Sequence, residues 1–228
     1  TYPHSLEKLD IDDNTSLWAS ETADYQPSPS LTNDIEVDVA IIGGGYTGGS
    51  AAYYLREHFP NYRIAILEAK SLGNGASGRN GGMLLNRLHE SDYVDDATYA
   101  KIYHATNDRI DMMIDIIEQN KLNVQYRRDG SLQIFTKPEN VEHAKHEVER
   151  GNRIGIPFQY LSPDALRQKI NLHGNIYGAL FDPNEGQING AQFVREMKKL
   201  LVARDVQIYE ETPVIAIEPD QVVQLTTP

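Results

Sequence analysis

The chain has 228 residues, and 33 acidic against 21 basic residues give it a formal net charge of −12. This excess of acid disfavours nucleic acid and anionic membrane surfaces as partners. Cysteine is absent, which excludes disulfides, thiolate catalysis, cysteine-ligated metals and a cysteine-linked cofactor. The lack of cysteine fits a reducing cytoplasm. The uncharged run from Val39 to Leu55 is cut by five glycines, so we expect no membrane span.

The N-terminal residues 1–34 are predicted to form an irregular arm. Polar side chains dominate this stretch, and three prolines interrupt it: Pro3, Pro27 and Pro29. Trp18, the single tryptophan of the chain, is expected to anchor the arm to the body of the protein, since a large apolar ring in a polar stretch usually packs against a core.

Regular structure is predicted from Ile35 onward. Alternating apolar residues lead into the continuous apolar run Ala40–Ile42, a pattern typical of a strand that becomes buried on both faces. A helix is predicted from Thr47 to His58, and a second strand from Arg63 to Leu67. Together these elements form a βαβ unit that ends at Glu68.

The rest of the chain alternates between helical and strand periods. Apolar residues at a 3.6-residue period predict a long helix from Asp96 to Asn120. A period of two over Val124–Phe135, centred on Asp129-Gly130, predicts a β-hairpin. Further helices are predicted at 139–150 and 191–203, and strands at 176–181, 206–209, 214–217 and 222–225. We therefore expect an α/β fold in which a parallel sheet carries a second, partly antiparallel insertion.

The first motif is the run Gly43–Gly48, a G-x-G-x-x-G match. It lies between a predicted strand and a predicted helix, which is the context that dinucleotide binding requires. Gly43 permits the tight turn, Gly45 lets a pyrophosphate approach the backbone, and Gly48 lets the helix pack closely on the strand. Glu68, at the end of the second strand, is placed to accept the hydroxyl groups of an adenosine ribose.

The second motif is the glycine-rich stretch Gly75–Gly82, which reads Gly-Ala-Ser-Gly-Arg-Asn-Gly-Gly. It offers bare backbone N–H groups together with one hydroxyl, Ser77, one cation, Arg79, and one amide, Asn80. Such a surface suits the close approach of a flat, polar, anionic group. The apolar residues 83–85 follow directly, which indicates an anchored, buried loop.

These motifs together resemble the FAD-dependent amine and D-amino-acid oxidoreductases of the glycine oxidase, sarcosine oxidase and γ-glutamylputrescine oxidase type. A third stretch, Phe181–Ile188, resembles the segment where these enzymes return from the substrate domain to the FAD domain. The resemblance implies a Rossmann-like FAD-binding domain with a β-meander, and part of an inserted α+β substrate domain. The expected division is an arm at 1–34, an FAD-binding domain at 35–120 and 184–228, and a substrate domain at 121–183.

The resemblance implies FAD as the cofactor and a small-molecule amine as the substrate. The implied cofactor-binding residues are Gly43, Gly45, Tyr46, Thr47, Gly48, Glu68, Ala69, Lys70, Gly75, Ala76, Ser77, Arg79, Asn80, Gly81, Gly82, Met83 and Val214. Neither a catalytic residue nor a metal ligand is nominated. The implied reaction is oxidation of a carbon–nitrogen bond by hydride transfer to flavin N5, in which the flavin supplies the chemistry.

Two features depart from the family. Gly49 stands where members commonly have a bulky aliphatic residue, so we expect looser helix packing there. Members also run to nearly twice this length, so we expect the chain to be an N-terminal portion that is colourless and inactive in isolation. Two alternatives stay open: a dehydrogenase that binds NAD at the same glycine turn, and a non-catalytic fragment or subunit that needs a further chain to complete the flavin site.

Overall fold

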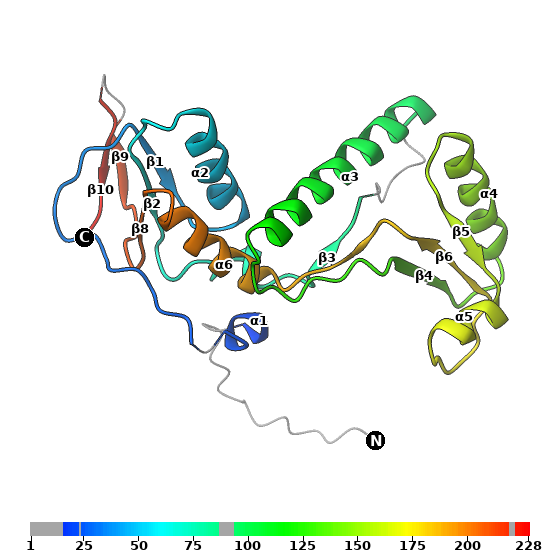
Figure 1. Cartoon of the computed structure of the whole chain (residues 1–228). Coiled ribbons are helices and arrows are strands. Elements are labelled where there is room, and N and C mark those ends of the chain that lie inside the picture. Colours follow the sequence, from blue (N-terminus) through cyan, green and yellow to red (C-terminus); the bar gives the residue numbers. More distant parts are fainter. Residues whose placement is uncertain (1–15, 23, 87–93, 219–221) are drawn as a thin grey trace, which may run out of the picture. The chain divides into compact units, whose positions relative to one another are not determined.

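The computed structural model describes residues 16–22, 24–86, 94–218 and 222–228 (Figure 1). The chain divides into two compact units. Unit 1 comprises residues 1–81, 122–124 and 189–228, and unit 2 comprises residues 82–121 and 125–188. The first half of the predicted arm, residues 1–15, lies outside the described residues.

Unit 1 is built on a parallel sheet of the order β1-β2-β8. Its strands are β1 (Val39–Ile42), β2 (Ile64–Leu67) and β8 (Val206–Tyr209). All four residues of β2 are buried, as expected for an apolar strand in the middle of a parallel sheet. The expectation that the first strand is buried on both faces is wrong. β1 alternates between half-buried and exposed positions, and Ile42 is 50% exposed, because β1 pairs only with β2 among the described strands.

Two helices pack on this sheet, α2 (Tyr46–His58) and α6 (Gly190–Val202). Asn189 is the N-cap of α6, because its side chain accepts a hydrogen bond from the Gln192 N–H. Its buried residues recur at the helical period: Gly190, Ala191, Phe193, Val194, Met197 and Leu201. The two helices pack on each other as well as on the sheet, which closes the core of unit 1.

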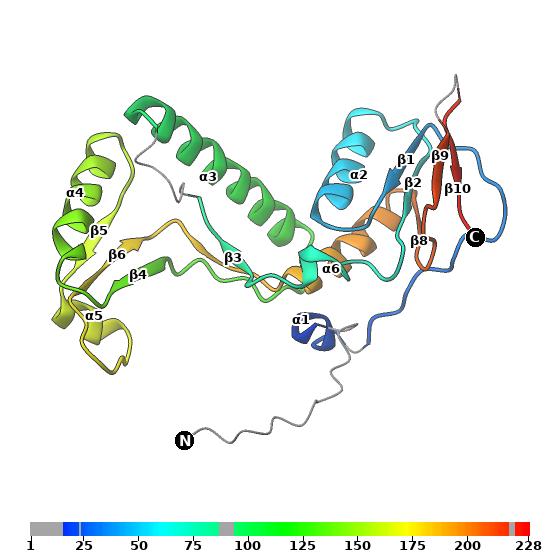
Figure 2. The same ribbon diagram turned by 180° about the vertical axis from the view of Figure 1, so that it is seen from behind.

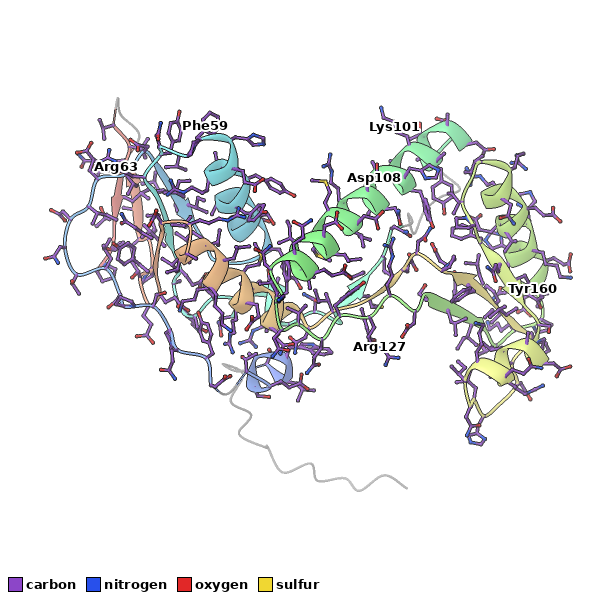
Figure 3. The ribbon with its side chains drawn as sticks, viewed as in Figure 1. Phe59, Arg63, Lys101, Asp108, Arg127 and Tyr160 are labelled. Carbon is purple, nitrogen blue, oxygen red and sulfur yellow. The ribbon has the colours of Figure 1, made fainter. Side chains whose placement is uncertain are left out.

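The connection between α2 and β2 is a tight turn that is fixed on the surface. The Phe59 ring (Figure 3) stacks on the Tyr62 ring, with the two centroids 4.8 Å apart. Arg63 pairs with Asp38 at 3.0 Å and also donates its backbone N–H to the same carboxylate. These contacts hold the start of β2 beside the start of β1, which sets their register.

The remaining elements of unit 1 are short. The helix α1 (Leu17–Ser20) lies in the arm and is capped by Ser16, so the arm is less irregular than expected. The strands β9 (Ala216–Glu218) and β10 (Gln224–Thr226) form an antiparallel pair, in the region where a β-meander was expected. The helical turn η1 (Ala76–Gly78) lies inside the second glycine-rich motif.

Unit 2 is an antiparallel sheet with helices (Figure 2). The sheet has the order β4-β6-β5, and a separate pair joins β3 to β7. The strands are β3 (Met83–Leu84), β4 (Ser131–Phe135), β5 (Gln159–Leu161), β6 (Gly178–Asp182) and β7 (Gly186–Gln187). The helices are α3 (Asp96–Gln119), α4 (Asn140–Arg153) and α5 (Pro163–Lys169). None of the helices in the described part of the chain is long and apolar enough to cross a bilayer.

The expected hairpin at 124–135 is wrong: the chain only bends at Asp129 and does not reverse direction there. Gly130 has φ +87°, which glycine adopts easily. Arg127 forms a bridge with Gln187, whereas β4 pairs with β6. The two halves of the expected hairpin therefore pair with neighbours far along the chain and not with each other.

The unit boundaries differ from the expected domain boundaries at α3. The sequence interpretation grouped this helix with the FAD-binding domain, whereas it lies in unit 2. Its residues Tyr99 and Tyr103 share a buried cluster with Phe135, Phe158 and Leu180, and this packing holds the helix to the antiparallel sheet. The functional assignment of the domains stays a proposal.

Candidate cofactor site

The glycine turn between β1 and α2 has the geometry that its sequence predicts. Gly43 has φ +96°, a conformation that L side chains rarely adopt. Gly48 has no room for a side chain, because a Cβ there would lie 2.0 Å from the Gly43 carbonyl oxygen. Gly45 is the N-cap of α2 and has no side chain with which to cap it. The positive end of α2 is therefore approached by bare backbone, as anion binding at a helix N-terminus requires.

Glu68 follows β2 and is fixed by two backbone donors. Its Oε2 accepts the Gly44 N–H at 2.7 Å, and its Oε1 accepts the Lys70 N–H at 2.9 Å. The side chain is half-buried, whereas Ala69 and Lys70 are exposed. The carboxylate is thus held beside the glycine turn, where a ribose attached to a bound pyrophosphate would meet it.

The second glycine-rich motif lies against the first. Ser77 Oγ accepts the backbone N–H of Tyr46, the first residue of α2, at 2.9 Å. A Cβ on Gly45 would lie 2.8 Å from the same hydroxyl oxygen. Gly78 is buried, and a Cβ there would lie 2.0 Å from the Gly73 carbonyl oxygen. The expectation that this loop is anchored is confirmed, but the expectation that it is buried is wrong: within 75–82 only Gly78 and Gly82 are buried, because the loop is held mainly through its backbone.

Arg79 and Asn80 lie at the exposed end of this loop. Arg79 donates from Nε to the Asn74 carbonyl at 2.7 Å, and Asn80 donates from Nδ2 to the Ser77 carbonyl at 3.0 Å. Burial raises the pKa of the Tyr46 phenol, and a hydrogen bond with Asn80 partly offsets that effect. The loop therefore brings a hydroxyl and an amide to Tyr46 at the N-terminus of α2, and it carries a guanidinium at its exposed end.

Three further predicted residues are Gly82, Met83 and Val214. Gly82 and Met83 belong to unit 2, and Met83 is 69% exposed on β3. Val214 is half-buried between Thr212 and β9. The roles predicted for these three residues, like those of the other site residues, stay proposals.

Sequence reasoning missed two residues that support this site. Leu72 is buried against Gly44, and Glu210 is fully buried and accepts the Leu72 N–H at 2.7 Å. A signal for Glu210 was present in the sequence. It follows β8 directly, as Glu68 follows the neighbouring parallel strand β2, and Leu67 and Tyr209 are partners in register. Acidic residues at the ends of adjacent parallel strands gather at one edge of the sheet.

The arrangement fits a dinucleotide cofactor. A Cβ at Gly45 or Gly48 would occupy the space at the start of α2 where the backbone packs closely. The first N–H groups of a helix have no intrahelical acceptors, so they are available to a ligand. Phosphate oxygens suit those donors, and the oriented Glu68 carboxylate suits ribose hydroxyls. Glycine-rich backbone, helix N-terminus and acid lie on three different elements that the fold brings together.

The chain belongs to the FAD dependent oxidoreductase (DAO) family, whose model matches residues 38–228. It is 29% identical over 216 residues to the probable oxidoreductase OrdL of Haemophilus influenzae, an alignment that covers 91% of this chain and 49% of the relative. It is 26% identical over 210 residues to gamma-glutamylputrescine oxidoreductase of Escherichia coli, which covers 90% of this chain and 48% of that protein.

A solved structure shows the same fold. Glycine oxidase from Geobacillus kaustophilus superposes with a TM-score of 0.71 at 22% identity, over 84% of this chain and 51% of that one. The chain thus spans about half the length of the curated relatives that it matches. Its fold is the α/β fold of the FAD-binding oxidases, with a parallel sheet and several antiparallel ones.

Proposed function

We propose that the chain binds FAD at the N-terminus of α2, as part of an enzyme that oxidises the carbon–nitrogen bond of a small amine or amino acid. One observation carries the proposal: the hydrogen bond from the Tyr46 N–H to Ser77 Oγ joins the two glycine-rich motifs. An NAD-binding domain needs only the first motif, whereas here a second polar loop lies on it.

The roles of the residues follow from their positions. The backbone at Gly43, Gly45 and Gly48 would hold the pyrophosphate, and Glu68 would hold the adenosine ribose. The loop around Ser77 and the side chain of Arg79 would face the phosphates and the flavin end. Arg79 would also supply a positive charge to an anionic reduced flavin. FAD supplies the hydride-accepting ring, and the protein orients it and excludes competing reactions.

The substrate class rests on the relatives. E. coli gamma-glutamylputrescine oxidoreductase and Geobacillus glycine oxidase are named for an amine and for an amino acid. The net charge of −12 favours a small-molecule substrate over nucleic acid or an anionic membrane surface. The absence of cysteine supports a cytoplasmic location.

The test is a visible absorption spectrum of the purified full-length protein, followed by anaerobic addition of a panel of amines and amino acids. We expect the two flavin bands, release of FAD on denaturation, and bleaching by at least one amine. A protein that lacks flavin bands and binds NAD instead would reject the proposal in favour of the dehydrogenase. A protein that binds flavin but is bleached by no amine would retain the cofactor and reject the substrate class.

A further inference from the structure

Glu210 is a buried carboxylate that is hydrogen-bonded to three separate segments of unit 1. Its side chain is 0% exposed. Oε1 accepts the Leu72 N–H at 2.7 Å, and Oε2 accepts the Ser28 N–H at 2.5 Å and the Lys198 ammonium at 2.9 Å. A buried carboxylate is tolerated only when donors surround it. The buried Glu210 carboxylate therefore needs donors from three segments at once: the arm, the loop after β2, and α6.

On one side, Glu210 fixes the residue that packs on the glycine turn. The Leu72 N–H donates to Glu210, and the Leu72 carbonyl accepts from Arg195 Nε at 3.4 Å. The Leu72 side chain lies against Gly44, since a Cβ on that glycine would be 2.0 Å from Leu72 Cδ2. The Gly73 N–H also donates to the Gly44 carbonyl at 3.2 Å. The position of Leu72 thus determines which surface the glycine turn packs against.

The next two residues hold the same loop through their backbone. The Glu211 N–H donates to the Lys70 carbonyl at 2.8 Å, and the Thr212 N–H donates to the Glu68 carbonyl at 2.9 Å. The segment 210–212 therefore holds the loop at three points, and this loop carries the carboxylate proposed for the ribose.

On its other side, the segment 210–212 holds the arm. The Tyr25 hydroxyl lies 2.8 Å from both carboxylate oxygens of Glu210, and the Leu31 N–H donates to Thr212 Oγ1 at 3.0 Å. The Tyr25 ring is covered by two cations, with Arg195 at 4.3 Å and Lys198 at 4.6 Å from its centroid. The arm is thus a docked part of unit 1.

We infer that Glu210 is a positioning residue for the cofactor site, and that through it docking of the arm and binding of FAD strengthen each other. The inference rests on the proposed function, because it takes FAD as the ligand of the Glu68 loop. When the arm is released, Glu210 loses donors and Leu72 is held less firmly, so FAD has to order the loop on binding. By thermodynamic reciprocity, bound FAD must then hold the arm more tightly.

The test uses Thr212→Val in the full-length protein. This variant removes the hydroxyl that accepts the Leu31 N–H and donates to the Glu210 backbone carbonyl, while the backbone bond from residue 212 to the Glu68 carbonyl is retained. We expect the FAD dissociation constant to rise roughly 2- to 10-fold, the effect of about one hydrogen bond. Glu210→Ala is unsuitable, because it leaves the half-buried Lys198 ammonium without its carboxylate and threatens the fold. Ser162→Ala, which removes the N-cap of α5 in unit 2, is the matched control and should leave FAD binding unchanged.

Amide hydrogen exchange supplies the second readout. In the wild-type protein, FAD should slow exchange in peptides covering residues 25–31 as well as in those covering 43–48, and Thr212→Val should weaken the effect at 25–31. Protection of 43–48 without any change at 25–31 would overturn the inference and leave the proposed function standing. So would an unchanged FAD dissociation constant in Thr212→Val despite faster exchange of the arm. Failure of the wild-type protein to bind FAD would reject the proposed function, and the inference with it.

Discussion

The Glu68 carboxylate and the Gly44 backbone N–H are joined by a hydrogen bond of 2.7 Å, which links the end of β2 to the turn after β1. Parallel pairing of the two strands makes this contact possible, since Ile42 and Leu67 are partners in register. The side chain that is proposed to recognise the ribose is therefore oriented by the same turn that is proposed to hold the pyrophosphate.

We predict that Glu68→Ala weakens FAD binding by roughly 10- to 100-fold. A charged hydrogen bond contributes ~1.5–3 kcal/mol, and loss of that energy raises the dissociation constant by this amount. Titration of the flavin-free protein with FAD, followed by fluorescence, measures the change. Glu57→Ala removes an acid from the exposed surface of α2 and serves as the control. An equal FAD dissociation constant in the wild-type and Glu68→Ala proteins would show that Glu68 does not bind the cofactor.

Two adjacent glycines of α2 are predicted to respond in opposite directions to alanine. In Gly48→Ala the new Cβ would lie 2.0 Å from the Gly43 carbonyl oxygen, and such overpacking destabilises a fold by about 1–3 kcal/mol or more. In Gly49→Ala the Cβ meets nothing within 4 Å, and replacing a helical glycine by alanine stabilises by up to ~1 kcal/mol. Urea unfolding of both variants tests the pair; a loss of stability in Gly49→Ala would show that this glycine is required.

Open space beside Gly49 agrees with the looser packing expected there. A pocket beside this glycine is lined by apolar residues of β2 and α6, among them Ile66, Phe193 and Met197. A larger aliphatic residue at position 49 would therefore have room, and Gly49→Val is a natural extension of the alanine experiment.

Arg79→Ala is predicted to weaken FAD binding or to slow flavin reduction. The guanidinium lies at the exposed end of the Ser77 loop and donates to the Asn74 carbonyl. The variant would remove a positive charge from a site that is proposed to bind an anionic cofactor. Arg127→Ala is the matched control, because Arg127 is a surface cation of unit 2 whose side chain is 69% exposed (Figure 3). Stopped-flow reduction and FAD titration of the two variants measure the effect. Equal FAD dissociation constants and equal rates of flavin reduction in the two variants would show that the Arg79 charge does not act on the cofactor.

Stability is predicted to fall in acid through Glu210. Burial alone raises the pKa of this carboxyl, but hydrogen bonds from Ser28, Leu72, Lys198 and Tyr25 outweigh it and hold the pKa below its ordinary value of 4.5. Because the folded-state pKa is lowered, the contribution to stability is present above pH 4.5 and is lost as the pH falls through the lowered pKa. Thermal unfolding from pH 7 to pH 3 should show a steeper acid loss for the wild type than for Glu210→Gln, and parallel curves would contradict this assignment.

Elements with a strong local signal were predicted well from the sequence. The helix from Asp96 follows a clear 3.6-residue period and ends within one residue of its predicted boundary. The buried strand β2 and the glycine turn were likewise predicted, because their residue types are tied to local backbone geometry. The anchored loop could be inferred from the apolar residues that follow it.

What failed depends on contacts between residues far apart in the chain. The pair Asp129-Gly130 reads in the sequence as the tip of a hairpin, yet the partner of β4 is β6, which local periodicity cannot identify. The exposure of the β1 side chains depends on whether another strand pairs with the second edge of β1, which the sequence of β1 itself does not indicate. The importance of Glu210 arises from Ser28 and Leu72 meeting at one carboxylate, a convergence that only the folded chain reveals.

The parallel sheet of unit 1 also sets an order of events during synthesis. Ile64 of β2 pairs with Val206 of β8, and all of unit 2 is encoded between them. A ribosome must therefore complete the antiparallel sheet of unit 2 before the apolar strand Ile64–Leu67 can gain its second neighbour. During that interval β2 has an open, apolar edge of the kind that invites pairing with other chains. Slow closure of this non-local contact makes the nascent protein a candidate for chaperone assistance.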